Sequence, residues 1–463
     1  MEGQQLSLYD IEYDKYKITR PIRLIELFSG YGSQALALKY LGVPFENWKT
    51  CEWAIKSIQA YKDIHFADDN TDYSKNLNKE QIQEFLFNKG ISSNYNEPMN
   101  KEQINRLSEN NLRIIYNNIQ ATHNLVNIQQ VKGEDLEIEN TDKYDYIMTY
   151  SFPCQDLSLA GKGKGMSDTS TRSGMLWEVE RILNELDEKP QILLMENVPQ
   201  VHSQDNLEDF NKWKYRLEEM GYKNYWQDLI ATDYGIPQTR NRTFMVSILG
   251  DYSYTFPKPI PLKLKLKDML ENVVDEKYYL SDKMKQYIFS KDDKYKVNEN
   301  SLKLNREIAC SKTTREGWTR ADTSDYIVET CLLKNKATEI SKITNETNTL
   351  MARDYKGFGN QEMNAVIEQK IINTYDEYNH KINGNETIGT IQAMYSTPNH
   401  GHRLIYNDLR IRKLTPRECF RLMGVKDEDF DKVAKNQSDS SLYHLAGDSI
   451  VVNVLMAIFK EMI

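Results

Sequence analysis

The segment IRLIELFSGYGSQALALKYLG, residues 22–42, decides the fold of this chain. Residues 22–28 are mostly apolar, which predicts a buried strand. Residues 33–42 place apolar side chains at three- and four-residue spacing, which predicts a helix. The turn between them, Ser29-Gly30-Tyr31-Gly32, lets the backbone turn tightly, and the helix N-terminus offers free N–H groups to a ligand. The segment therefore predicts the first strand–turn–helix unit of an open α/β sheet.

The same alternation of apolar runs and amphipathic stretches continues to about residue 249. Further strands are predicted at residues 144–150, 192–195 and 242–249, and a helix at 173–186. Strands that alternate with helices favour a Rossmann-like α/β domain, with a mostly parallel sheet and helices on both faces.

Two stretches interrupt this alternation. Residues from about 67 to 124 are rich in Asn and Lys, and they predict a helical insertion for which contact with a ligand is one interpretation. After residue 256 the chain becomes rich in Thr, Gly and Asn with short extended runs, which is typical of a separate irregular domain. We therefore predict a first domain over 20–255, completed by 436–463. A smaller β-rich domain with its return segment is predicted over 256–435.

Composition limits the classes of protein that remain. The chain has 463 residues, and its 59 basic and 68 acidic side chains give a net charge of −9, which excludes a globally basic nucleic-acid binder but allows a locally basic cleft. The five cysteines are widely spaced and form no CxxC pair, which disfavours a disulfide framework or a zinc site and indicates a reducing compartment. The amino terminus lacks the apolar core of a signal peptide, and no apolar stretch reaches the length of a membrane span. We expect a soluble, cytoplasmic protein that does not enter a membrane.

A carboxylate follows the glycine turn at a characteristic distance. Glu52 lies twenty residues beyond Gly32, at the end of a predicted strand, where it can accept hydrogen bonds from ribose hydroxyls. Trp53 beside it could stack on an adenine ring. A glycine turn alone also serves purely structural purposes, but this combination favours a nucleoside cofactor without saying which one.

A cysteine follows the strand predicted at 144–150. The sequence SFPCQDLSLAG, residues 151–161, places Pro153 and Cys154 at the carboxyl end of that strand, where open α/β sheets bind ligands. A buried structural thiol is the alternative. The polar flanking residues and the Gly- and Lys-rich loop that follows, residues 161–174, favour a reactive thiol beneath a mobile cationic loop.

Two further motifs place polar side chains at strand ends. Glu196 ends the apolar run ILLM, and burial there disfavours its charged form, so that a protonated side chain could donate to a ring nitrogen; an ordinary turn acid is the alternative. Gln238, Arg240 and Arg242 point to one side of an extended chain and could hold a carbonyl oxygen and phosphates, unless they belong to a solvated edge strand. The histidines have no acidic or cysteine neighbours at metal-ligand spacing, so no metal site is predicted.

Taken together and in this order, the motifs resemble those of the DNA (cytosine-5) methyltransferases, and most closely the bacterial and mycoplasma-type restriction–modification or orphan enzymes. The segments that carry the resemblance are ELFSGYGSQALAL, CEW, SFPCQDLS, TRSGMLWEVERIL, LLMENV, QTRNR, RKLTPRECFRLMGV and GDSIVVNVL. Two positions depart from the usual pattern, because Asn127 stands where an acid is more common and Asp448 where Asn is more common. These isosteric changes bear on cofactor affinity and not on the chemistry.

The resemblance implies that a methyl group passes from S-adenosylmethionine to C5 of a cytosine flipped out of a specific duplex sequence, through a covalent adduct of Cys154 with C6. S-adenosylhomocysteine is the other product, and no metal takes part. The catalytic residues implied are Pro153, Cys154, Gln155, Glu196, Arg240 and Arg242. The implied cofactor contacts are Phe28, Ser29, Gly30, Tyr31, Gly32, Glu52, Trp53, Asn127, Ile128, Asp448 and Ser449. By the same resemblance, the loop 155–173 closes over the flipped base and residues 256–411 read the target from the major groove.

The implied partner is double-stranded DNA, bound by a monomer, with a cognate restriction endonuclease as a genetic partner. Two alternatives stay open within the family: a relative that binds DNA without methylating it, and an RNA cytosine-5 methyltransferase. A dinucleotide-dependent oxidoreductase fits the glycine turn and no other motif.

Overall fold

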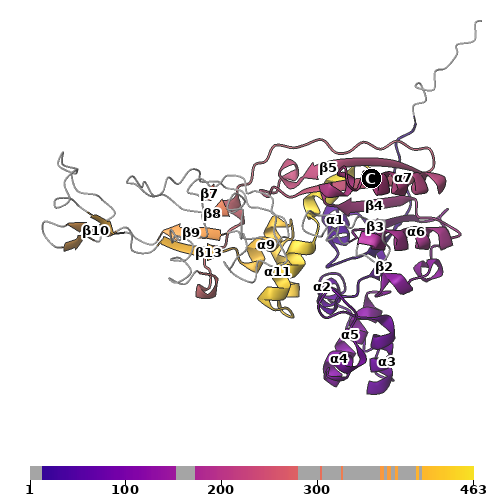
Figure 1. Ribbon diagram of the computed structural model, residues 1–463, viewed down its shortest axis with the longest axis horizontal. Helices are drawn as coiled ribbons and strands as arrows, with labels where there is room; N and C mark the ends of the chain where they lie inside the picture. The colour runs from indigo at the N-terminus through magenta and orange to yellow at the C-terminus, as the bar shows by residue number, and fades with distance from the viewer. Residues whose placement is uncertain are drawn as a thin grey trace, which may run out of the picture.

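The computed structural model describes residues 13–152, 173–279 and 414–463 in full, and between 280 and 413 the backbone of short strands (Figure 1). Its centre is a six-stranded sheet in the order β2-β1-β3-β4-β6-β5. The strands are β1 Ile22–Leu27, β2 Phe45–Cys51, β3 Asp145–Tyr150, β4 Ile192–Asn197, β5 Tyr222–Ile230 and β6 Asn241–Leu249. The first four run parallel, whereas β6 is antiparallel to both β4 and β5. The predicted α/β fold with a mostly parallel sheet is confirmed.

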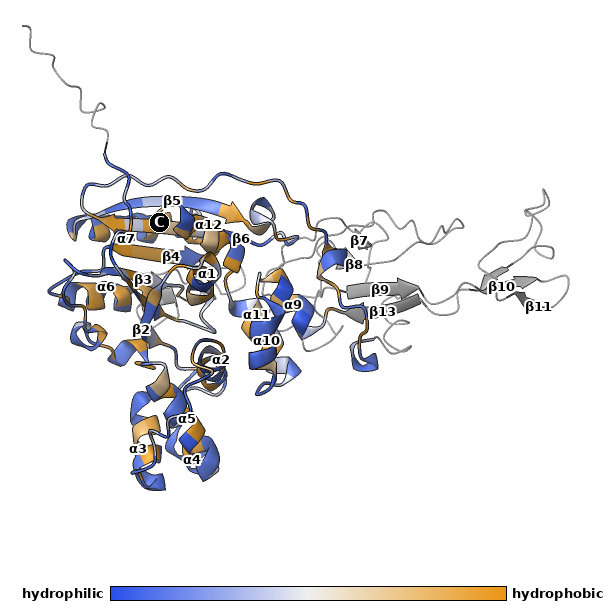
Figure 2. Cartoon of the chain, turned by 180° about the vertical axis from the view of Figure 1, so that it is seen from behind, coloured by the Kyte–Doolittle hydropathy of each residue, from blue (hydrophilic) through white to orange (hydrophobic). Residues whose placement is uncertain are grey.

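Helices cover both faces of the sheet, and alternate residues of each strand pack into two separate cores. Leu24 and Ile147 face the core formed with α1, α9, α10, α11 and α12, whereas Ile25 and Met148 face the core formed with α6 and α7. The helices are α1 Ser33–Leu41, α2 Ile55–His65, α6 Leu176–Glu185, α7 Leu207–Glu219, α9 Pro416–Leu422, α10 Asp427–Ala434, α11 Asp439–Asp448 and α12 Val452–Lys460. Figure 2 shows the resulting pattern, with apolar strands between helices whose outer sides are hydrophilic.

The predicted insertion is helical and has a small core of its own. Its helices are α3 Lys79–Lys89, α4 Lys101–Asn105 and α5 Glu109–Ala121, which lie together below the sheet in Figure 1. Asn78 and Asn100 each cap the next helix by accepting a hydrogen bond from a backbone N–H, with Gln81 and Gln103 completing the capping boxes. The Asn-rich composition of this region is therefore partly a set of helix starts.

The carboxyl-terminal helices belong to the core of the sheet domain. The stretch Asp439–Lys460 is, among the described residues, the one helical stretch long and apolar enough to cross a membrane by composition, and 72 % of it is buried within the protein. It divides into α11 and α12, and α12 packs on α1. Residues 414–434, which the sequence analysis groups with the second domain, also contribute Leu414, Phe420 and Val433 to this core.

The chain leaves the sheet domain after residue 279, and the described strands beyond it form two small sheets. These strands are β7 Lys303–Leu304, β8 Asp325–Tyr326, β9 Ala365–Gln369, β10 Asn373–Asp376, β11 Lys381–Asn383, β12 Arg403–Ile405 and β13 Leu409–Lys413. Their orders are β13-β9-β8-β7 and β11-β10-β12. The division at residue 256 stays a prediction.

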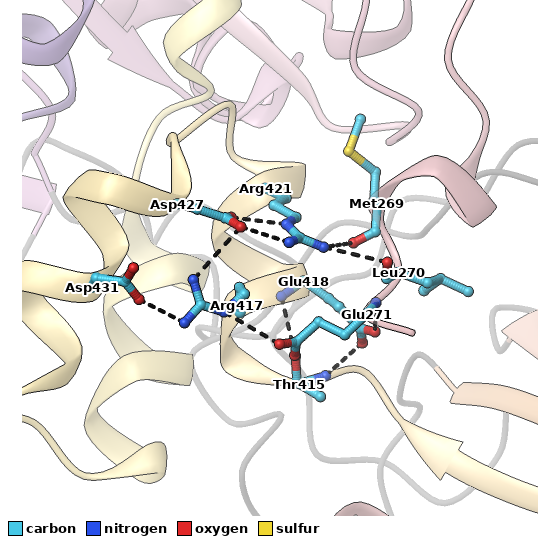
Figure 3. Close-up of polar contacts among 9 residues, drawn as sticks. All are labelled: Met269, Leu270, Glu271, Thr415, Arg417, Glu418, Arg421, Asp427 and Asp431. Carbon is cyan, nitrogen blue, oxygen red and sulfur yellow. Dashed lines mark hydrogen bonds and ion pairs between the residues drawn. The ribbon is translucent and has the colours of Figure 1, made fainter. Parts of the chain in front are cut away.

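A polar cluster joins the outgoing and returning chain (Figure 3). Arg421 donates to the carbonyls of Met269 and Leu270 at 3.1 and 3.3 Å. Glu271 forms an ion pair with Arg417 at 3.2 Å, and its N–H donates to Glu418 at 2.8 Å. These contacts hold residues 269–271 against α9.

Candidate active site

The glycine turn between β1 and α1 adopts backbone angles that favour glycine. Gly30 and Gly32 have φ angles of +56° and +83°, and Phe28 between strand and turn has +60°. A Cβ on Gly32 would lie 2.4 Å from Nε2 of His65, so this position has no room for a side chain. A Cβ on Gly30 would meet Ser449 Oγ alone, at 4.0 Å. The turn therefore has no free space at Gly32, on the side of α2. It has free space at Gly30, near Ser449 between α11 and α12.

The side chain of Tyr31 turns away from the open side of the turn. It is fully buried and stacks on Phe420 of α9, with ring centroids 5.3 Å apart. A cofactor contact from Tyr31 would therefore have to come from its backbone. Ser29 is also buried, but its hydroxyl has no hydrogen-bond partner among the described residues. A buried hydroxyl without a partner at this turn is what a polar ligand would satisfy.

Glu52 follows β2 and binds the glycine turn directly. Its carboxylate accepts hydrogen bonds from the N–H groups of Gly30, at 3.1 Å, and Ala54, at 2.8 Å. Burial raises the pKa of Glu52 to about 7, and the nearby carboxylate of Asp448 adds to the rise. The two acids therefore lie on the same side of the turn, although they are almost 400 residues apart in the sequence.

The sequence analysis missed the residue that holds Glu52 in place. Asn124, at the end of the insertion, accepts from the N–H of Glu52 at 3.0 Å and donates to its carbonyl at 2.9 Å. Trp53, which follows Glu52, is half-buried and packs against the core of the insertion. Nothing in the sequence pattern marks Asn124 for this role, because the contact spans 72 residues.

The remaining predicted cofactor residues lie in two segments, one after the insertion and one at the end of α11. Asn127 and Ile128 are mostly buried, and Asn127 Oδ1 accepts from the N–H of Gln129 at 3.1 Å. The side chain of Asp448 is 59 % exposed, and one of its oxygens lies 3.1 Å from Nε2 of His444. The hydroxyl of Ser449 donates to Leu445 at 2.6 Å.

The ends of β3 and β4 form the second half of the candidate site. Glu196 faces two donors, because one oxygen lies 3.1 Å from Nε of Arg242 and the other accepts a short hydrogen bond from the Ser151 hydroxyl. Asn197 donates to the carbonyl of Phe152 at 3.0 Å. These contacts hold Ser151 and Phe152, which follow β3, against the end of β4. Pro153, Cys154 and Gln155 come next in the sequence. Those three residues lie outside the described part of the chain.

The structure defines what surrounds Glu196. The guanidinium of Arg242 and the hydroxyl of Ser151 contact its two carboxyl oxygens. The predicted protonated Glu196 stays a prediction.

Gln238 and Arg240 are buried, so they cannot bind phosphates as the sequence analysis allowed. Gln238 is fully buried and donates to the carbonyl of Leu422 in α9 at 2.7 Å. Arg240 is 4 % exposed and donates to the carbonyls of Gly447 and Ser449 at 3.1 and 2.7 Å. Burial and the neighbouring Arg242 lower the pKa of Arg240 to about 9. Arg240 therefore connects the end of α11 to the strand that carries Arg242.

The two cysteines in the described part of the chain, Cys51 and Cys419, are buried. Burial also raises the pKa of the Cys51 thiol, which is the opposite of what a nucleophile needs. Among the described residues no group of His, Cys, Asp and Glu could hold a metal ion.

The sequence matches a protein family over most of its length. Residues 100–463 match the family of C-5 cytosine-specific DNA methylases. The chain belongs to this family. It is 30 % identical to the type II methyltransferase M2.ScrFI of Lactococcus lactis, over 95 % of this chain and 99 % of that protein. It is 36 % identical to the orphan methyltransferase M.SssI of Spiroplasma monobiae, over 65 % of this chain and 77 % of that protein.

Solved structures agree with the fold of this C-5 cytosine DNA methylase. A DNMT2 structure from Spodoptera frugiperda matches with a TM-score of 0.54 and 16 % identity, over 95 % of this chain and 99 % of that one. A methyltransferase of Entamoeba histolytica matches with a TM-score of 0.53 and 14 % identity, over 96 % and 98 %. Family membership confirms the resemblance found in the motifs and makes the protein a DNA (cytosine-5) methyltransferase.

Proposed function

We propose that this methyltransferase transfers a methyl group from S-adenosylmethionine to C5 of a cytosine flipped out of a specific duplex DNA sequence. The observation that carries the proposal is the Glu196–Arg242 pair, which lies beside Ser151 at the strand end that leads into Cys154. A carboxylate and a guanidinium at that point are suited to bind the ring edge of a pyrimidine while a thiolate attacks the ring.

The residues of the glycine turn fit the cofactor. The open side of Gly30, the unpartnered hydroxyl of Ser29 and the carboxylate of Glu52 offer polar groups to a nucleoside. Glu52 would accept from the ribose hydroxyls, Trp53 would pack on the base, and Asp448 would face the charged end. S-adenosylmethionine supplies a methyl group on a sulfonium centre. The other proposed contacts come from Phe28, Tyr31, Gly32, Asn127, Ile128 and Ser449.

Cytosine C5 needs activation before it can accept a methyl cation equivalent. The Cys154 thiolate adds its electron pair to C6, which makes C5 nucleophilic, and C5 then takes the methyl group. Arg242 would bind the O2 carbonyl, and Glu196 would give a proton or donate a hydrogen bond to N3, which stabilises the negative charge that develops on the ring. A base then removes the C5 proton, and the C–S electron pair leaves with sulfur. Arg240 holds α11 and Arg242 in place without touching the substrate.

The reacting carbon is inaccessible in a stacked duplex, so the base must flip out, which costs a few kcal/mol. The loop 155–173 is proposed to close over it, and residues 256–411 to read the target sequence. The proposed molecule is a cytoplasmic monomer whose positive potential lies in a cleft between its two domains. It would act in a restriction–modification system with a cognate endonuclease, or as an orphan enzyme in defence, phage protection or regulation.

The decisive experiment replaces the proposed nucleophile. Cys154→Ala should keep S-adenosylmethionine binding and the thermal unfolding midpoint but abolish transfer of labelled methyl groups to mixed-sequence duplex DNA. A duplex containing 5-fluorocytosine should be trapped covalently on the wild-type protein and not on Cys154→Ala. Retained activity in Cys154→Ala would overturn the assignment.

Two comparisons separate the alternatives within the family. A relative that binds DNA without methylating it would retain duplex DNA but transfer no labelled methyl group to it. For an RNA methyltransferase, added tRNA would compete with the DNA and take up the labelled methyl groups. Bisulfite mapping of DNA from cells that express the protein would test activity and identify the target sequence at once.

A further inference from the structure

The helical insertion is attached to the candidate cofactor site through a loop between α3 and α4. The N–H of Ser92 donates to the carbonyl of Trp53 at 2.7 Å, and the N–H of Ile55 donates to the carbonyl of Ser92 at 2.9 Å. The hydroxyl of Ser92 donates to the carbonyl of Glu97 at 2.7 Å, which closes the loop on itself. The loop 92–97 is therefore fixed to the backbone that directly follows Glu52.

Tyr95 lies in this loop and reaches the carboxyl-terminal helix pair. Its φ angle of +62° is unusual for an aromatic residue, so the surroundings must stabilise this conformation. The ring packs on the imidazole of His444 in α11, with centroids 3.8 Å apart. Its hydroxyl is buried near Ser57 of α2 and Ser441 of α11, and it has no hydrogen-bond partner among the described residues. Tyr95 thus bridges the insertion, α2 and α11.

The electrostatic surroundings of Tyr95 locate it beside both acids of the cofactor half. Burial raises the pKa of its hydroxyl, and the carboxylates of Glu52 and Asp448 raise it further. Asp448 in turn lies 3.1 Å from Nε2 of His444, on whose ring Tyr95 packs. Tyr95 therefore stands between the turn after β2 and the end of α11.

We propose that Tyr95 is a positioning residue for S-adenosylmethionine, contributed by the insertion. Its ring covers the cofactor between Glu52 and α11, and it holds His444 so that Asp448 keeps facing the ligand. This inference rests on the function proposed above. The contacts described for Tyr95 lie on the cofactor half of the site, so its loss is expected to weaken cofactor binding and leave the chemical step unchanged.

The test uses the full-length protein and two substitutions of Tyr95. Tyr95→Asn removes the ring but tolerates a positive φ, so it separates loss of the ring from backbone strain. Tyr95→Phe keeps the ring. Tyr73→Asn is the matched control, because Tyr73 lies in the same insertion, is 40 % exposed and donates to Asp69.

We expect Tyr95→Asn to raise KM for S-adenosylmethionine about fivefold to tenfold, the worth of one aromatic contact, with kcat within about twofold. Release of labelled cofactor in a chase should be faster by a similar factor. Tyr95→Phe and Tyr73→Asn should both match the wild type, and all four proteins should unfold at similar temperatures.

Three results would overturn the inference. These are an unchanged KM in Tyr95→Asn, an equal rise in Tyr73→Asn, or a fall in kcat without a change in KM. Equilibrium dialysis with the wild type keeps the two proposals distinct, because a wild type that binds no S-adenosylmethionine contradicts the proposed function itself. If the wild type binds S-adenosylmethionine and Tyr95→Asn binds it with the same affinity, only this inference is contradicted.

Discussion

The two halves of the candidate site hold their acids in different ways. Glu196, at the end of β4, faces a guanidinium and a hydroxyl, both from side chains. Glu52, after β2, faces two backbone N–H groups and no cation, and burial raises its pKa to about 7. The first acid therefore lies in an ion pair with a side chain, whereas the second can change its charge near neutral pH. This difference predicts that the β4 half controls the rate of the chemical step and the β2 half controls cofactor affinity.

The largest effect is expected at Glu196. Glu196→Gln keeps the size of the side chain but removes the acid that is proposed to give a proton to N3 as negative charge develops on the ring. We expect kcat to fall by about 10²- to 10³-fold, measured by methyl transfer at saturating DNA and cofactor. Duplex DNA affinity should stay within about threefold of the wild type.

Glu134→Gln is the control for this change, because Glu134 is 75 % exposed and pairs with Lys132 on the surface. It should keep wild-type kcat. An unchanged kcat in Glu196→Gln would remove this residue from the chemistry and end the distinction between the two halves.

The sequence could predict features that depend on a local residue pattern, but not features that depend on contacts between distant segments. The strands β1, β3, β4 and β6 are mostly apolar because both of their faces are covered, and each was predicted. The edge strand β5, YKNYWQDLI, pairs with β6 alone and keeps polar residues, so the apolar pattern did not identify it. The antiparallel direction of β6 follows from this edge pairing.

The sequence predicted the motif residues of the site but not the residues that hold them in place. Glu52 and Arg242 stand out by spacing and charge, and the structure brings Arg242 to Glu196 and Glu52 to the glycine turn. The burial of Tyr31 under Phe420 and the hold of Asn124 on Glu52 depend on segments distant in the chain. Such contacts follow from packing, which residue spacing does not encode.

A smaller effect, on binding, is expected at Glu52. In Glu52→Gln one carboxylate oxygen is replaced by an NH2 group. This group would face a backbone N–H, so the side chain loses one of its two hydrogen bonds to the backbone. It also loses an acceptor for the ribose hydroxyls. We expect KM for S-adenosylmethionine to rise about tenfold, with kcat within about threefold. The ionised carboxylate is the better acceptor, so wild-type affinity should increase as the pH rises through about 7.

Calorimetric titrations from pH 6 to 8 would test this pH dependence. Glu52→Gln should lose it, while Glu46→Gln, at the other end of β2 and 51 % exposed, should keep it. A kcat defect as large as that of Glu196→Gln would contradict the division between the two halves.

The smallest effect is expected at Glu26, which lies fully buried in β1 behind the glycine turn. It accepts from the N–H of Ala35 at 3.3 Å and from the Tyr61 hydroxyl at 2.6 Å, and burial raises its pKa to about 7 from an ordinary value of 4.5. Between these pH values the folded protein binds more protons at Glu26 than the unfolded chain, so this group lowers stability as the pH rises.

Glu26→Gln carries no charge, and Tyr61 can then donate to Asn47, which lies 3.0 Å away. Between pH 6 and 8 the wild type should lose about 1 kcal/mol of unfolding free energy relative to Glu26→Gln, measured by urea unfolding at each pH. The contribution of Glu52 is present in both proteins and cancels in this comparison. If the unfolding free energies of the two proteins differed by the same amount at every pH, Glu26 would have its ordinary pKa. Burial beside this turn would then not destabilise the charged form of the carboxyl group. The titratable character assigned to the cofactor half would then rest on Glu52 alone.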